Sequence, residues 1–187
     1  NGTGDGLSQA YNYRICLTDS LENMIPISKP ENYDPSHYEL LIRLMEAQPD
    51  KTEMTDYFIW SPLPGRKTDV NNKGGFSTDM IGANHDYPEG SYEERQSIIQ
   101  AHEDYTLGLL YFVGHDERVP KQIREEMLRW GLPKDEYVET GNWSPQLYVR
   151  ECRRMVGEYV ATQKDCEQKT DVSDWVGMAA YTMDSHN

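Results

Sequence analysis

The length and composition of this chain indicate one folded domain and exclude two classes of partner. Its 187 residues suit a single domain, and 13 Tyr with 4 Trp supply the aromatic surface that disordered segments lack. The formal charge of −14 repels phosphate backbones, and no apolar run approaches the roughly 18 residues that a membrane span needs. We therefore expect neither nucleic acid nor a membrane as a partner.

The cysteines and the acidic residues do not predict a metal site. Cys16, Cys152 and Cys166 are odd in number and form no C-x-x-C pair, so neither a disulfide scaffold nor a zinc site is expected. Residues 69–80 resemble a calcium loop in part, but a lysine and a methionine stand where that loop needs ligands. We interpret the three cysteines as ordinary thiols.

The first part of the chain predicts a strand and a helix. Apolar and polar residues alternate over residues 10–18, as in a strand, whereas residues 19–33 hold two prolines and predict an extended loop. Asp34 followed by Pro35 is typical of an N-cap before a first-turn proline. A helix is therefore expected over residues 35–47.

A long polar stretch is the predicted location of the functional site. Residues 57–60 form a brief apolar run that we interpret as a strand. A glycine-rich stretch without periodicity follows, from Gly65 to Gly90. Long stretches without regular structure are uncommon inside compact domains and are often functional.

The middle of the chain predicts two helices. Ser91 and Glu94 form a capping box, and apolar residues at helical spacing continue to about Gly114. Pro120 opens a second helix, for which Gly131 is the expected C-terminal stop.

The last part of the chain predicts more strands. Residues 133–145 are expected to form a loop. Residues 147–162 are rich in Val and Tyr and indicate a long strand, with a helix as the alternative, and residues 175–183 indicate another strand. Strands at both ends with helices between them predict an α+β fold with a mixed or antiparallel sheet, in one domain spanning residues 1–187.

Several segments together resemble the FAD-dependent oxidoreductases. They lie in the family's order and span nearly the whole chain: QAYNYRICLT (9–18), KTDVNN (67–72), FSTD (76–79), YVRECRRMVGEY (148–159) and the final MDSHN (183–187). The resemblance implies a bacterial protein of the cytoplasm or periplasm, with FAD in the intact enzyme and a hydroxylated or sugar-like substrate. Some relatives carry the label xanthan lyase, which points towards a carbohydrate ligand.

One expected family feature has no match here. Members open with a G-x-G-x-x-G turn between a strand and a helix, where the FAD pyrophosphate binds. Gly2, Gly4 and Gly6 precede no such unit. The resemblance therefore implies a fragment, the substrate-side or cap domain of a larger enzyme, inactive alone and without FAD of its own. Its expected partner is the missing FAD-binding domain or another copy of the chain, and it should expose an apolar face.

In the intact enzyme, the resemblance implies that Arg150, Arg154 and His186 are catalytic partners of the flavin. A guanidinium binds an oxyanion bidentately, and a histidine with a pKa near neutrality accepts a proton from a hydroxyl group. The alternatives are structural ion pairs for the two arginines and a flexible terminal residue for His186.

The glycine-rich stretch concentrates candidate substrate ligands. Asp69, Asn71, Asn72 and Asp79 supply carboxylates and amides, which suit sugar hydroxyls that both donate and accept. His85 is expected to bind substrate with them. The alternative is a set of Asx turns in a solvated loop.

Two other functions stay open from the sequence. A non-catalytic carbohydrate-binding or interaction module would bind a glycan without any dependence on flavin. A polysaccharide lyase would use Asn84 to neutralise a uronate and His85 or Tyr87 to abstract its proton. His102 lies on the apolar face of its helix and is expected to be a core histidine.

Overall fold

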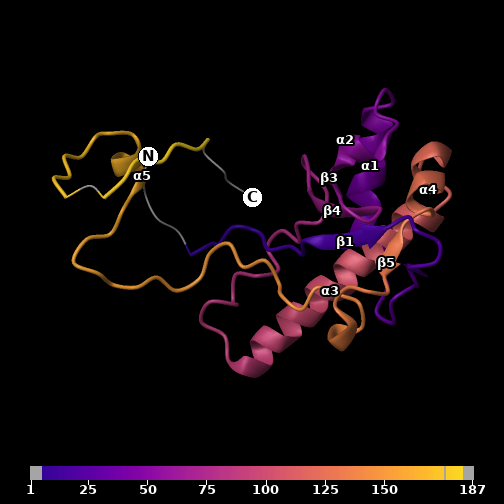
Figure 1. Cartoon of the computed structure of the whole chain (residues 1–187), viewed down its shortest axis with the longest axis horizontal. Helices are drawn as coiled ribbons and strands as arrows, with labels where there is room; N and C mark the ends of the chain where they lie inside the picture. The colour runs from indigo at the N-terminus through magenta and orange to yellow at the C-terminus, as the bar shows by residue number, and fades with distance from the viewer. Residues whose placement is uncertain (1–5, 175, 183–187) are drawn as a thin grey trace.

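The computed structural model describes residues 6–174 and 176–182. Within them, helices pack against a five-stranded antiparallel sheet, which confirms the predicted α+β fold (Figure 1). The strands are β1 (Ile15–Thr18), β2 (Met24–Pro26), β3 (Phe58–Leu63), β4 (Lys67–Asn72) and β5 (Gly131–Pro133). The helices are η1 (Pro35–Tyr38), α1 (Glu39–Ala47), α2 (Met54–Tyr57), α3 (Tyr92–His115), α4 (Lys121–Met127), η2 (Val138–Thr140) and α5 (Gln163–Cys166). None of these helices is long and apolar enough to cross a membrane.

The sheet places the first strand at its centre. The strand order is β2-β5-β1-β4-β3, and each neighbouring pair is antiparallel. β3 and β4 form a hairpin whose turn passes through Gly65 and Arg66, with φ of 77° and 60°. β4 then pairs with the whole of β1, and Ile15 lies opposite Val70.

The core lies between one face of this sheet and the helices. Ile15, Leu17 and Val70 project from the central strands and are almost fully buried. Leu109 and Phe112 of α3 are buried in the same apolar cluster. Burial of these side chains, at roughly 25 cal/mol per Å² of apolar surface, is the main force that holds α3 to the sheet.

A close contact between η1 and α3 fixes the positions of residues that line the cleft described below. A Cβ atom on Gly108 would lie 2.3 Å from the Tyr38 hydroxyl oxygen, so any larger residue there would force the Tyr38 side chain to move. The Tyr38 hydroxyl donates to the carbonyl of Tyr105 at 2.9 Å, and its ring centroid lies 5.0 Å from that of Phe112. Tyr38 therefore fixes η1 against the middle of α3.

Two of the helix predictions are confirmed. Asp34 accepts a hydrogen bond from the Ser36 amide and caps η1, which continues into α1 as far as Ala47. Ser91 and Glu94 form the reciprocal hydrogen bonds of a capping box at the start of α3.

Two strands lie where the sequence predicted loops, so both loop predictions are wrong in part. β2 lies within residues 19–33, and β4 lies within the stretch from Gly65 to Gly90. β4 points Thr68 and Val70 into the core and carries polar residues on its other face, so its apolar signal is weak. β3 also continues past the predicted end, through Pro62, which an edge strand tolerates.

The prediction that Gly131 ends a helix is wrong. α4 ends at Met127, and Gly131 begins β5. A Cβ atom on Gly131 would lie 2.2 Å from the carbonyl oxygen of Ile25, so this glycine permits the close approach of β2.

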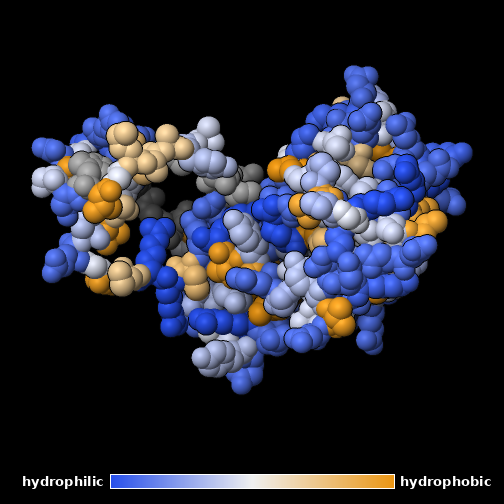
Figure 2. All heavy atoms as spheres, viewed as in Figure 1, coloured by the Kyte–Doolittle hydropathy of each residue, from blue (hydrophilic) through white to orange (hydrophobic). Residues whose placement is uncertain are grey.

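The strands predicted over residues 147–162 and 175–183 are not found among the described residues. Tyr148 makes an isolated antiparallel bridge with Asn12, and the chain then leaves the sheet (Figure 1). A strand needs a neighbour for its N–H and C=O groups, and among the described residues this segment has none beyond that bridge. Residue 163 begins the short α5. Several apolar side chains in the last part of the chain are exposed, among them Met155, Val156 and Met178 (Figure 2).

Candidate functional site

The loop that follows β4 forms a cleft together with η1, α1 and α3. The cleft has a volume of about 460 Å³. Its lining residues are His37, Leu40, Asn72, Gly74, Gly75, Phe76, Ser77, Asp79, Met80, Ile81 and Tyr105. Two of the predicted substrate ligands, Asn72 and Asp79, are therefore brought together, within the stretch where the sequence placed the site.

The polar and apolar side chains that line the cleft differ in how far they are exposed to solvent. Ser77 and Tyr105 are buried, and the Asp79 side chain is 11% exposed. Leu40 and Ile81 are more than half exposed. The cleft thus combines buried polar groups with exposed apolar ones, and in small-molecule pockets a few placed polar groups fix the orientation of the ligand.

Arg150 stands behind the cleft and holds Asp79. Its side chain is 8% exposed, and Nη1 lies 3.2 Å from the Asp79 carboxylate and donates to the carbonyl of Ala10 at 2.5 Å. Nη2 donates to Asn72 Oδ1 at 3.4 Å, and the guanidinium lies 5.0 Å from the ring centroid of Tyr148. Arg150 therefore links the two polar cleft residues, Asn72 and Asp79, to the backbone of Ala10, which precedes β1.

A second cluster of polar side chains, formed by Asn12, Asn71 and Thr78, is held by hydrogen bonds of its own, and its last two members directly precede Asn72 and Asp79 in the sequence. The Asn12 amide donates to Asn71 Oδ1 at 2.8 Å and to Thr78 Oγ1 at 3.2 Å. Asn12 and Thr78 are fully buried, and Asn12 Oδ1 has no hydrogen-bond partner among the described atoms. Asn71 is thus placed next to the site but uses its side chain to bind the protein itself.

Tyr105 contributes a hydroxyl that stays protonated. It donates to the carbonyl of Ser77 at 3.0 Å. Burial, together with the nearby negative charge of Asp79, raises the Tyr105 pKa far above its ordinary value. Tyr105 therefore acts at neutral pH as a fixed donor that shapes the loop, and it is not available as a base.

Asp69 lies away from the cleft, on the other face of β4. It binds Arg14 through two hydrogen bonds. Both residues line a separate, open depression of about 450 Å³ that also includes Cys16 and Lys67. The structure therefore does not bring Asp69 together with Asn72 and Asp79.

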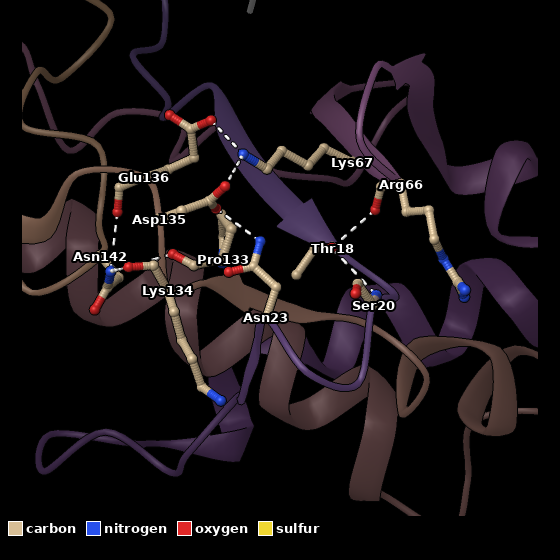
Figure 3. A network of polar contacts seen from close by, with 10 residues as sticks. All are labelled: Thr18, Ser20, Asn23, Arg66, Lys67, Pro133, Lys134, Asp135, Glu136 and Asn142. Atoms are coloured by element: carbon tan, nitrogen blue, oxygen red, sulfur yellow. Dashed lines mark hydrogen bonds and ion pairs between the residues drawn. The ribbon is translucent and has the colours of Figure 1, made fainter.

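Lys67 holds the loop after β5 against the sheet. Its ammonium group lies 2.9 Å from the Asp135 carboxylate and 2.5 Å from that of Glu136 (Figure 3). These two hydrogen bonds raise the pKa of Lys67. Asn142 closes the same loop by donating to three carbonyl groups, including that of Glu136 at 2.9 Å (Figure 3). These contacts tie the loop after β5 to β4.

His85 and Asn84 hold the first described residues rather than face the cleft. His85 Nδ1 accepts a hydrogen bond from the Ser8 amide at 3.2 Å. Asn84 is fully buried, and its amide donates to Ser8 Oγ and to the carbonyl of Gln9, both at 2.8 Å. A fully buried Asn84 cannot contact a uronate, so the geometry gives the lyase hypothesis no support.

The remaining candidates lie outside the cleft. Arg154 is exposed in the segment that leaves the sheet, and the neighbouring Arg153 pairs with Glu89 at 3.1 Å. His186 lies outside the described residues. His102 is buried, as predicted, with Nδ1 2.7 Å from the carbonyl of Ile98.

Sequence reasoning missed His37, Phe76 and Tyr105 as cleft residues. Tyr105 belongs to the inner stripe of a predicted helix and gives the same signal as a core residue. Phe76 lies in the FSTD segment that carries the family resemblance, which was the available clue. His37 reaches the cleft through the contact between η1 and α3, which no local pattern reveals.

The described residues do not fit the pyrophosphate of FAD in the way that dinucleotide-binding folds do. Such folds place a glycine-rich turn between a parallel strand and the helix that follows it. Here the paired strands are antiparallel, and Gly74 and Gly75 follow β4 in a loop that reaches α3 only at Tyr92.

Comparison with known proteins identifies the family. The sequence profile described as FAD dependent oxidoreductase matches residues 2–187. No curated protein and no solved structure matches the chain. Since the match spans nearly every residue, the chain belongs to the FAD dependent oxidoreductase family.

Proposed function

We propose that this chain is the substrate-side part of an FAD-dependent oxidoreductase and that the cleft beside Asn72 and Asp79 binds a hydroxylated or sugar-like molecule. The observation that carries the proposal is the pairing of these polar groups with a half-buried aromatic ring, Phe76, in one cleft of about 460 Å³. Sugars present hydroxyl groups at their edges and C–H groups on their faces. Amide and carboxylate groups bind the former, and apolar side chains pack against the latter.

The residues divide into groups that contact the ligand and groups that position others. Asn72, Ser77 and Asp79 line the cleft and are the proposed ligand contacts. Arg150 is a positioning residue, because it reaches Asp79 and Asn72 and does not line the cleft itself. His186 stays a proposed base on the strength of the sequence resemblance.

FAD is the redox cofactor on which members of the family depend. The described residues contain no dinucleotide cradle of the usual type, so the proposed flavin site belongs to another domain or another copy of the chain. Adding FAD to the purified chain, washing it and recording the visible spectrum tests this point. If flavin absorption is retained after washing, the proposal that the flavin is held elsewhere is refuted. If the absorption is lost, the proposal is supported.

Ligand-observed NMR with a panel of neutral methyl glycosides tests the cleft. We expect saturable binding at millimolar concentrations, and we expect Asn72→Ala to weaken it. Ser97→Ala, an exposed change on α3 outside the cleft, is the matched control and should bind as the wild type does. Absence of saturable binding for the whole panel, or equal binding by the Asn72 variant, would refute the cleft assignment.

A non-catalytic carbohydrate-binding module is the competing function. It would also bind glycosides, but the ligand would never reduce a flavin. Reconstitution with a flavin-binding partner, followed by anaerobic spectra with the bound glycoside, separates the two. Bleaching of the flavin supports the oxidoreductase, whereas an unchanged spectrum supports the module.

A further inference from the structure

A small pocket lies outside the cleft, where α2, β3 and α4 meet. Its volume is about 260 Å³. Residues 52–55 at the start of α2 line it, together with Trp60 of β3 and with Gln122, Ile123 and Glu126 of α4. We call it the Trp60 pocket. Pockets for drug-sized molecules span roughly 300–1,000 Å³, so this volume suits a single small ring.

The floor of the Trp60 pocket is apolar and aromatic. Met54 and Ile123 are buried, and Trp60 is half-buried. Trp60 lies opposite the buried Val70 in the pairing of β3 with β4, so it projects from the face of the sheet that the helices cover. The ring of Trp130 packs edge-to-face against that of Trp60, with centroids 5.2 Å apart and planes at 78°. This favourable aromatic pair holds the Trp60 ring in place beside the pocket.

The charged groups of the Trp60 pocket are already used by the protein. Glu126 accepts a hydrogen bond from the Trp130 indole at 3.1 Å and pairs with Arg129 at 3.0 Å. Glu53 belongs to the capping box at the start of α2. No lysine, arginine or histidine stands among the described residues that line the pocket. Recognition of a ligand therefore falls to the neutral groups.

Four neutral polar groups of the Trp60 pocket make no hydrogen bond within the described part of the chain. They are the hydroxyls of Thr52 and Thr55, the side-chain amide of Gln122 and the indole N–H of Trp60. Thr52, Thr55 and Gln122 are exposed, so their polar groups are hydrated and open to a ligand. Hydroxyl and amide groups both donate and accept, whereas the indole N–H only donates.

This combination fits a sugar ring better than other small ligands. A sugar has a C–H face that packs against an aromatic ring, and hydroxyl groups at its edge that both donate and accept. An alkyl chain would cover the polar rim and leave its groups without partners, which is unfavourable. A phosphate or carboxylate would meet no cation among the described lining residues.

We propose that the Trp60 pocket is a second binding site, separate from the cleft, that takes the ring of a neutral sugar. Trp60 supplies the face on which the ring stacks, and the rim groups of Thr52, Thr55 and Gln122 bind its hydroxyls. The proposal goes beyond the proposed function, because among the described residues the pocket and the cleft share no lining residue.

Tryptophan fluorescence reports on this pocket. Trp60 lines it and Trp130 contacts Trp60, whereas no tryptophan is found among the described residues that line the cleft. Methyl glucoside, galactoside and mannoside are titrated into the wild-type chain and into Asn72→Ala. We expect at least one glycoside to change the fluorescence saturably at millimolar concentrations, with the same Kd in both chains.

The opposite result separates this inference from the proposed function. If ligand-observed NMR detects binding but the fluorescence stays constant, the sugar binds in the cleft alone. The same conclusion follows if the fluorescence change disappears in Asn72→Ala. Either result overturns the inference and leaves the proposed function standing.

A variant at the rim tests the pocket without removing the fluorescent reporter. Gln122→Ala deletes one hydrogen-bonding side chain and should raise the Kd about two- to tenfold, the share of one hydrogen bond. Gln96→Ala is the matched control, since Gln96 is also an exposed helical glutamine but lies outside the pocket and the cleft. It should leave the Kd unchanged. An equal Kd for Gln122→Ala and the wild type would overturn the inference.

A second variant removes the stacking face. Trp60→Leu keeps an apolar residue but lacks the ring and the indole N–H. Combined with Asn72→Ala, it should abolish the glycoside binding that NMR still detects in Asn72→Ala alone, with near-ultraviolet circular dichroism confirming the fold. If the double variant does not fold, Gln122→Ala decides. Saturable quenching by tetramethylammonium but by no sugar would assign the pocket to organic cations and would also overturn the inference.

Discussion

Replacing Arg150 by methionine should cost much of the stability of the domain. The substitution keeps most of the side-chain volume but removes the cation that pairs with Asp79 and the donors that reach Ala10 and Asn72. Both partners of the ion pair are nearly buried, with side chains 8% and 11% exposed. Removal of one partner from a buried pair typically destabilises a protein by about 3–5 kcal/mol, because the other charge stays buried and uncompensated.

Urea denaturation followed by near-ultraviolet circular dichroism measures this loss. Arg14→Met is the matched control, since Arg14 also pairs with an aspartate but is 45% exposed. Exposed pairs contribute about 0–1 kcal/mol, so the control should unfold at nearly the wild-type urea concentration. A double variant, Arg150→Met with Asp79→Leu, should recover part of the loss because it leaves no buried charge. A loss for Arg150→Met no larger than that for Arg14→Met would refute the reasoning.

Three further predictions concern the scaffold. Gly131→Ala forces a new Cβ atom to within 2.2 Å of a backbone carbonyl and should destabilise the chain by about 1–3 kcal/mol or more in urea, whereas Gly75→Ala meets no atom within 4 Å and should be nearly neutral. Ser91→Ala removes a cap and should cost about 1 kcal/mol, against little change for Ser97→Ala within the same helix. Burial lowers the pKa of His102. When the pH falls below the ordinary histidine pKa, the unfolded chain therefore binds a proton at His102 that the folded chain does not bind. Stability should therefore fall on acidification, and His102→Gln should show a smaller fall; equal pH profiles would contradict this.

The helices were predictable because their signals are local. The Asp34 cap and the capping box of Ser91 and Glu94 lie within four residues of the groups that they bind. Such short-range hydrogen bonds depend little on the rest of the fold. The sequence alone therefore located η1, α1 and α3 closely.

The strands and the site were harder because their signals are long-range. β4 carries polar residues on its outer face and was interpreted as loop, since its partners, β1 and β3, supply the burial of Thr68 and Val70. The Val- and Tyr-rich residues 147–162 have the composition of a strand, but within the part of the chain that the structure describes they pair only at Tyr148. The contact between Arg150 and Asp79 joins residues more than seventy positions apart, and no spacing rule predicts it.

The four segments of the family resemblance that the structure describes meet in one place. Asn12 of the first segment binds Asn71 and Thr78 of the second and third. Arg150 of the fourth binds Asp79 and the carbonyl of Ala10. Segments scattered along the chain therefore build one buried polar junction, and Asn72 and Asp79 extend from it into the cleft. A family signature of this kind needs no catalytic group of its own, because a junction that fixes the polar side of the proposed substrate cleft constrains the same residues. Damage to this junction should therefore reduce ligand binding and stability together.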